Sequence, residues 1–252
     1  MNFSINRALA RLSTLSLFVA VLVPATALGA ARVHIRGTAY EFNNVKARLA
    51  GASIRVVEFP KLKATPRANG SFDLLVPAKA RITPYITMKG FSRVHLQTFT
   101  MAGKDLANVN FQTPRVDIAR ALGFLLGVPV SATGQPAQCV IVSTFSTKNV
   151  RNLKFEGFTG YGAHGIAGAT ARTFPMLPGP TYFNEDVIPD PGQLMSSKDG
   201  GVLWKSVPAG VYKVTAKKPG NRFASFTATC KPGRIVNANP PWGLFQTSGP
   251  GG

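Results

Sequence analysis

The residues best suited to chemistry in this sequence are a group of acids and an amide between Asn184 and Asp190. Asn184, Glu185, Asp186 and Asp190 lie close together, and Asp199 follows a few residues later. Several hard oxygen ligands on one flexible loop suit Ca²⁺, so this segment is a candidate calcium site. Its spacing is not that of an EF-hand, and Asp-Pro and Asp-Gly pairs are also common turn formers. Turn formation is therefore the open alternative.

A second candidate is His164, which shares the glycine-rich segment 160–165 with Tyr161. A loop that carries a phenol and an imidazole could contact a ligand, and an exposed loop without a ligand is the alternative. His34 and His95 are the only other histidines. The sequence contains neither a His-x-x-Glu zinc motif nor a Gly-x-Ser-x-Gly nucleophile elbow. We therefore expect a non-catalytic protein, with Ca²⁺ as the one cofactor to consider.

Aromatic side chains near the C-terminus form a third candidate site. Trp242 and Phe245 follow Pro240 and Pro241, after the last expected strand. An exposed tryptophan here could contact a carbohydrate or a protein. The alternative is that the segment folds back and covers an open sheet edge.

The two cysteines, Cys139 and Cys230, are flanked by strand-like sequence, Val140–Val142 and Phe226–Thr229. In an exported protein, two distant cysteines most simply form one structural disulfide. Such a bond closes a loop of about 90 residues, worth roughly 4 kcal/mol in the chain-entropy model. Free buried thiols are the alternative.

The N-terminus has the pattern of a cleavable signal peptide over residues 1–29. Arg7 and Arg11 precede an apolar run from Leu12 to Val23, and small residues follow it. That run is shorter than the roughly 20 apolar residues needed to span a bilayer. We expect an exported, periplasmic or extracellular protein without a transmembrane segment in its mature chain.

The charge of the chain is strongly positive and favours anionic partners. The formal net charge is +19, or +17 after the two arginines of the signal segment are removed. Such a field attracts anionic polymers and lipid headgroups. Long Lys/Arg runs and interleaved aromatic residues are absent, so sequence-specific nucleic-acid binding is not expected. The predicted partners are an envelope component, an anionic polymer or a protein.

Period-two alternation of apolar residues predicts β-strands in both halves of the chain. Phe72, Leu74 and Val76 alternate with other residues, as do Tyr212 and Val214. Turn-forming pairs such as Asn-Gly and Asp-Gly separate the expected strands. Prolines and glycines spread at these spacings favour short antiparallel strands rather than helices.

Residues 114–129 interrupt this pattern and are expected to link two domains. The domains are expected at 31–113 and 130–246, and residues 247–252 are expected to form a disordered tail. Thr113 and Pro114 resemble the start of a helix, and Val116, Ala119 and Leu122 would share one face. A short helix is therefore expected, with an extended linker as the alternative because glycines interrupt the pattern.

Two similar sets of motifs occur in the two halves. The second half contains Gly168-Ala169-Thr170, Asp199-Gly200-Gly201 and Val207-Pro208-Ala209-Gly210-Val211-Tyr212, and the first contains Gly51-Ala52-Ser53-Ile54, Asn69-Gly70-Ser71-Phe72 and Lys89-Gly90-Phe91. This pattern resembles the carboxypeptidase regulatory-like family, within the transthyretin-like and CnaB-like group. The first copy lacks the glycine after Pro77-Ala78.

The resemblance implies two tandem Greek-key β-sandwich domains, an all-β fold in which such modules serve as accessory, stalk or adhesive units. The resulting hypothesis is an exported, non-catalytic interaction protein. The competing hypothesis is a secreted enzyme or metal-dependent ligand-binding module that uses the 182–199 acidic loop. An enzyme should gather His164 or Tyr161 with these acids in a deep pocket.

Overall fold

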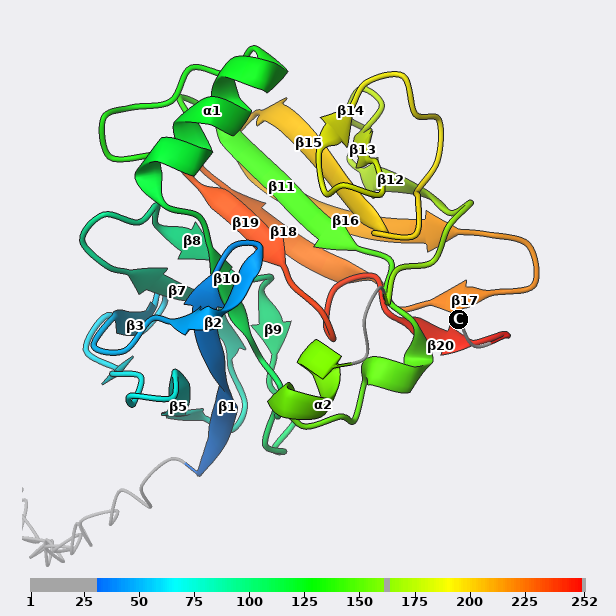
Figure 1. Ribbon diagram of the computed structural model, residues 1–252. Helices are drawn as coiled ribbons and strands as arrows, with labels where there is room; N and C mark the ends of the chain where they lie inside the picture. The colour runs from blue at the N-terminus through cyan, green and yellow to red at the C-terminus, as the bar shows by residue number, and fades with distance from the viewer. Residues whose placement is uncertain (1–30, 161–163, 251–252) are drawn as a thin grey trace, which may run out of the picture. The chain divides into compact units, whose positions relative to one another are not determined.

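The computed structural model describes residues 31–160 and 164–250 and consists mainly of β-strands (Figure 1). The all-β prediction is therefore confirmed for these residues. The predicted signal peptide lies outside the described residues and stays a prediction. Within the described ranges, no helix is both long enough and apolar enough to cross a membrane.

The first half of the described chain contains ten short strands. They are β1 (Arg32–Glu41), β2 (Asn44–Arg48), β3 (Ser53–Val56), β4 (Lys63–Ala64), β5 (Ser71–Pro77), β6 (Arg81–Ile82), β7 (Pro84–Thr87), β8 (Val94–His95), β9 (Phe99–Thr100) and β10 (Phe111–Thr113).

The second half adds helices and the remaining strands. They are α1 (Val116–Leu126), β11 (Cys139–Thr144), η1 (Lys148–Val150), α2 (Phe155–Gly160), β12 (Thr170–Phe174), β13 (Thr181–Phe183), β14 (Pro189–Asp190), β15 (Gly201–Val207), β16 (Gly210–Lys217), β17 (Arg222–Phe223), β18 (Phe226–Cys230), β19 (Ile235–Ala238) and β20 (Gln246–Ser248).

One nine-stranded sheet runs through both halves in the order β14-β13-β15-β11-β19-β8-β7-β3-β4. In the first half, a sheet of β10, β1, β2 and β5 forms a second layer, and in the second half β12, β16 and β18 do so. The pair β6 and β9 and the pair β17 and β20 complete the sheets among the described residues. Each half is thus a sandwich of two β-layers around its own core.

The first core lies between the β1 sheet and the β8-β7-β3-β4 end of the long sheet. Phe72, Leu74 and Val76 of β5 are buried, whereas Asp73 and Leu75 between them are exposed. The buried three belong to one apolar cluster with residues of β3 and β7. Period-two alternation on this strand therefore positions one layer of the sandwich.

The second core is closed by the disulfide predicted from the sequence. Ile141 of β11 and Val214 of β16 are fully buried in one cluster, which also contains Phe226 of β18. Cys139 on β11 and Cys230 on β18 are bonded, with their Cα atoms 5.5 Å apart. Because β11 and β18 belong to different layers, the bond joins the two sheets of this sandwich.

The two halves meet at the parallel pair β8 and β19, in which Ile235 lies opposite Val94. Beside it, the Thr98 amide donates to the Thr227 carbonyl at 2.8 Å, and the hydroxyls of Thr98 and Thr229 lie 2.8 Å apart. The chain from residue 31 onward forms one compact unit. The division into domains at 31–113 and 130–246 stays a prediction, and any such division would separate a hydrogen-bonded strand pair.

The linker contains the expected short helix, but its start differs from the prediction. Helix α1 begins at Val116 with Arg115 as N-cap, and no side chain caps it. Thr113 does not cap the helix because it pairs with Glu41 as the last residue of β10. The helix ends where Gly127 adopts a left-handed conformation at φ +65°.

The buried face of this helix differs from the predicted face, because it includes Gly123. The α-carbon of Gly123 lies so close to the following segment that a β-carbon would fall 2.3 Å from the Val130 side chain. The buried residues are Ala119, Gly123 and Leu126, whereas Val116 and Leu122 are only partly buried. A glycine at this point therefore allows α1 to pack closely against the chain that leaves it.

His95 is a buried ionisable group at the junction between the halves. Its side chain is 4% exposed and stacks on Tyr85, with the ring centroids 5.3 Å apart. Burial, together with the nearby cations Arg234 and Arg93, lowers the pKa of His95 to about 3. Its Nδ1 atom has no hydrogen-bond partner. The folded protein thus holds a neutral imidazole here.

Removal of the disulfide is expected to destabilise the protein strongly. The variant C139S/C230S should lose about 2–4 kcal/mol of free energy of unfolding, because the unfolded chain regains the freedom of a long loop. Urea denaturation followed by circular dichroism measures the loss. Reduction of the unmodified protein is the matched control and should give a similar value, whereas an unchanged midpoint in both would show that the bond adds no stability.

Acidification should destabilise the fold through His95. Its folded pKa of about 3 lies below the ordinary value of 6.5, so only the unfolded chain gains a proton as pH falls from about 6.5 towards 3. The resulting loss should reach about 2 kcal/mol at pH 5. The variant H95Q should lack this part of the pH dependence in denaturant titrations at pH 7.5 and pH 5. An equal acid sensitivity in H95Q would contradict the assignment.

Candidate functional site

The predicted acidic segment is occupied by turn hydrogen bonds. The Asn184 side-chain oxygen accepts hydrogen bonds at 3.0 Å from the amides of Asp186 and Ile188. A carboxylate oxygen of Asp190 accepts from the Gly192 amide at 2.8 Å. These are the local contacts by which Asn and Asp stabilise turns.

The remaining acids of this segment do not converge on a common point. Glu185 is exposed and lies 3.8 Å from the ammonium group of Lys198, and Asp199 accepts a hydrogen bond from the Gly201 amide at 3.0 Å. Among residues 31–160 and 164–250, no three His, Cys, Asp or Glu side chains are grouped so that they could hold a metal ion. The contacts in this segment are thus those of the turn-forming alternative.

His164 occupies a more distinctive environment. Its ring stacks on Phe158 of α2, with centroids 4.6 Å apart, and its buried Nδ1 atom has no hydrogen-bond partner. Burial lowers the pKa of His164. The Thr147 amide donates to the His164 carbonyl at 2.9 Å and fixes the backbone. Tyr161, predicted beside it as a ligand contact, lies outside the described residues.

His164 and Asp199 line the same polar cavity, which has a volume of about 210 Å³. Its wall combines residues of the first half with residues of the second, among them Tyr40, Asn43, Ser143, Thr144, His164, Asp199, Asn237 and Asn239. Sequence reasoning identified His164 and Asp199 but missed Asn237 on β19 and Asn239 directly after it. Asn237 and Asn239 carry no motif, and only the pairing of β19 within the long sheet brings them to this cavity.

The cavity is polar but contains no fixed positive charge. Its described lining includes neither Lys nor Arg. Burial raises the pKa of Asp199, and burial raises the pKa of Tyr40 to about 12. The Asn239 side-chain amide donates to the Tyr40 hydroxyl at 3.2 Å. Among the contacts of the described residues, no hydrogen bond or ion pair joins His164 to Asp199, so the two do not form an acid–base pair in this structure.

Trp242 is part of the contact between the halves. Its ring makes an edge contact with Phe99, with centroids 5.2 Å apart, and its indole nitrogen donates to the Ala107 carbonyl at 3.1 Å. The guanidinium of Arg151 lies 3.8 Å from the centre of the same ring. The aromatic segment therefore folds back on the body, which was the alternative to an exposed docking patch.

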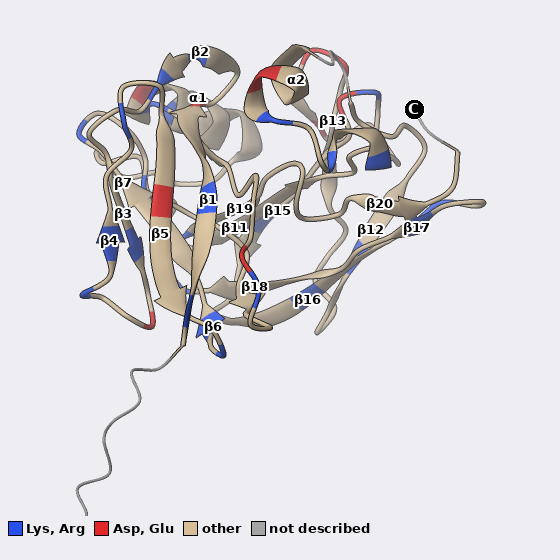
Figure 2. Cartoon of the chain, turned by 90° about the horizontal axis from the view of Figure 1, so that it is seen from below, with Lys and Arg blue, Asp and Glu red and all other residues tan. Residues whose placement is uncertain are grey.

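A cationic surface lies on the outer face of β12 and β16. We call Arg172, Lys213 and Lys217 the cationic face, because all three are exposed and point away from the buried Thr173 and Val214. Figure 2 shows Lys and Arg on β12, β16 and many other elements, and few Asp or Glu. In the described part of the chain, the carboxylates within 4.0 Å of a cation belong to other pairs.

No known family model matches this sequence, and no curated protein matches it. Among solved structures, the Bacillus anthracis TIE protein aligns with 86% of this chain and 35% of its own, at 11% identity and a TM-score of 0.27. The minor pilin GBS52 of Streptococcus agalactiae aligns over 86% of this chain and 98% of its own, at 7% identity and a TM-score of 0.27.

A type II cohesin–X-dockerin complex of Acetivibrio cellulolyticus aligns with 30% of this chain and 52% of its own, at 20% identity and a TM-score of 0.25. This chain thus spans about a third of the TIE protein and about half of the cohesin-complex chain. At TM-scores this low, the similarities carry no weight for the function of this chain. Membership of the carboxypeptidase regulatory-like family stays a prediction.

Substitution of Trp242 should test whether it is structural. The variant W242A loses the contact with Phe99, the hydrogen bond to Ala107 and the stacked Arg151, so it should cost about 3 kcal/mol of free energy of unfolding. The control W242F keeps an aromatic ring at this position but loses the indole nitrogen, and it should cost about 1 kcal/mol. Urea denaturation measures both. A W242A protein as stable as the unmodified one would mean that Trp242 is available for binding instead.

Proposed function

We propose that this chain is an exported, non-catalytic binding protein that attaches to an anionic polymer of the cell envelope through the cationic face. The arrangement of Arg172, Lys213 and Lys217 on one sheet surface is the observation that carries the proposal. Export rests on the predicted signal peptide. An accessory binding role agrees with what the carboxypeptidase regulatory-like resemblance implies.

Strand pairing sets the spacing of the three cations. Arg172 lies opposite Thr215, and Lys213 and Lys217 lie two residues to either side of Thr215 on the same face. Each lysine is therefore a diagonal neighbour of Arg172, at about 7–8 Å between α-carbons. Three positive groups at this spacing can contact successive anionic groups of one polymer chain.

The three cations of the cationic face are not paired with carboxylates. Its three side chains lie beyond 4.0 Å of every described carboxylate, so their field is not neutralised locally. Thr215 lies between them and is partly exposed. Its hydroxyl donates to the Arg172 carbonyl at 3.4 Å, so a sulfate, phosphate or carboxylate group would be held here by ionic contacts.

The second apolar core and the disulfide hold the sheet that carries these cations in place. Tyr212, Val214 and Phe226 are buried in the second core, and Cys230 ties β18 to the opposite layer. Because the backbone is fixed, binding need order only the long side chains. This favours recognition on a preformed flat surface over a site that assembles around its ligand.

The second candidate function, a secreted enzyme or ligand-binding module, is favoured by one observation. His164 and Asp199 line the same polar cavity. Asn184 and Asp190 are engaged in local turn contacts, and Glu185 lies 3.8 Å from Lys198. Among the described contacts, His164 and Asp199 make no direct hydrogen bond with each other. The binding function therefore remains the one that we propose.

Immobilised dextran sulfate, a linear sulfated polysaccharide, is the probe for this function, and neutral dextran is the reference. The mature protein should bind dextran sulfate at low salt and weaken as salt screens the contact. The variant R172Q/K213Q/K217Q should bind at least about tenfold more weakly. The measurement is surface plasmon resonance at two salt concentrations.

The matched control removes the same amount of charge elsewhere. Lys61, Lys79 and Lys104 are exposed in the first half, and K61Q/K79Q/K104Q should lower affinity by less than about threefold. Equal losses in the two triple variants would show that net charge alone attracts the polymer. Absence of binding at low salt by the unmodified protein would reject the proposed function.

A further inference from the structure

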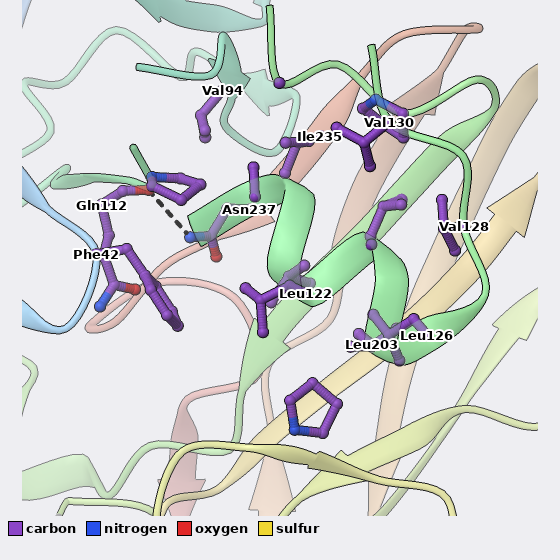
Figure 3. A pocket seen from close by; sticks show the side chains of 18 of the residues that line it. Phe42, Val94, Gln112, Leu122, Leu126, Val128, Val130, Leu203, Ile235 and Asn237 are labelled. Atoms are coloured by element: carbon purple, nitrogen blue, oxygen red, sulfur yellow. Dashed lines mark hydrogen bonds between the residues drawn. The ribbon is translucent and has the colours of Figure 1, made fainter. Parts of the chain in front are cut away.

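A second, apolar cavity lies beneath helix α1 (Figure 3). Its volume is about 100 Å³, and its wall consists almost entirely of carbon. Leu122 and Leu126 of α1 form one side, and Leu203 of β15 and Ile235 of β19 contribute to the sheet side. The cavity therefore lies between the helix and the long sheet, at the junction of the halves.

This apolar cavity adjoins the polar cavity that contains His164. The two share five lining residues, namely Phe42, Gln112, Val142, Phe183 and Asn237. At their boundary, the Asn237 side-chain amide donates to the Gln112 carbonyl at 3.4 Å (Figure 3). The two cavities thus lie side by side, and most of the polar lining belongs to the one that contains His164. We call that cavity the polar end of the pair, and the cavity beneath α1 the apolar end.

The chemistry of the polar end matches an uncharged, hydrogen-bonding group. Side-chain amides and hydroxyls line it together with the Asp199 carboxylate and apolar groups, and no Lys or Arg of the described chain lines either cavity. The ring of His164 also lines this end, and its Nδ1 atom is buried without a hydrogen-bond partner. The cation of Arg48 acts on Tyr40 but does not line the cavity, whereas the Asp199 carboxylate does line it. An anionic headgroup is therefore less suited to this end than a hydroxyl-rich group, which would find both donors and acceptors.

The local backbone also departs from its usual conformations at this cavity. Val187 and Asn43 both line the polar end, and both have positive φ, +64° and +55°. Positive φ is rare for a β-branched residue such as valine. Conformations of this kind cluster at ligand sites, where the surrounding structure holds them in place. A buried nitrogen without a partner, such as Nδ1 of His164, is costly for a folded protein.

We propose that the two neighbouring cavities together bind a small uncharged amphiphile, with a short aliphatic chain beneath α1 and a hydroxyl-rich head against Asn237 and His164. This site is distinct from the cationic face, so it adds a second ligand to the proposed function. The limited volume of the apolar end restricts the aliphatic part to a short chain.

Hexyl β-D-glucoside below its micelle-forming concentration is the probe, measured by isothermal titration calorimetry on the mature protein. It should bind more tightly than 1-hexanol or methyl β-D-glucoside, because each of these fills only one end of the space. Hexyl sulfate should bind more weakly, since the polar end lacks a cation. Equal affinity for hexyl sulfate, or no binding of hexyl glucoside at millimolar concentration, would overturn the proposal.

Two substitutions on the same helix locate the aliphatic chain. Ala119 is buried and lines the apolar cavity, so A119L should fill it and weaken hexyl glucoside binding at least about tenfold. Ala121 is exposed, and A121L is the control that should bind normally. If A119L does not fold, L122W fills the same space from a partly exposed position. Normal binding by a folded cavity-filling variant would contradict the site.

A third variant tests the polar end. N237L keeps the approximate size of the side chain and removes its amide, so it should weaken hexyl glucoside about threefold or more and leave 1-hexanol unchanged. Equal losses for the two ligands would show that Asn237 acts only on packing. Dextran sulfate binding by A119L and N237L should equal that of the unmodified protein, which separates this site from the cationic face.

Discussion

The parallel pairing of β8 with β19 is the contact on which the rest of the structure depends, because it makes one sheet from strands of both halves. Ile235 and Val236 of β19 lie opposite Val94 and His95 of β8. Both cavities lie along this junction, and each takes residues from both halves. The two cavities therefore lie at the junction, whereas the cationic face lies on the outer layer of the second half.

The junction is built with more polar groups than either core. A chain of hydroxyls, Thr83, Thr98 and Thr229, crosses it in two steps of 2.8 Å. The Gly243 amide donates to the Gln97 side chain at 2.9 Å. A buried polar group without a partner costs free energy, so these paired contacts favour one alignment of the two sandwiches. Apolar surfaces alone would allow the sheets to slide.

Local patterns in the sequence predicted the local structure well. Alternation identified β5 and β16, the lone cysteine pair identified the disulfide, and Asn69-Gly70 lies in a tight turn in which Gly70 bonds back to Arg67. The β8 and β19 pairing was not predictable, because β8 is two residues long and its partner is far along the chain. His164 was recognised as unusual, but its neighbours from other strands carried no signal. The predicted start of α1 at Thr113 was wrong, because Thr113 of β10 pairs with Glu41 and does not cap the helix.

The order of strands along the chain also has a consequence for biogenesis. A polypeptide that emerges from its N-terminus exposes β8 long before β19 exists, since residue 94 precedes residue 235. Until then the first sandwich has an open edge of unpaired backbone groups, which invites pairing with other molecules. The nascent first half thus needs shielding, and its sheet is complete only when almost the whole chain is available.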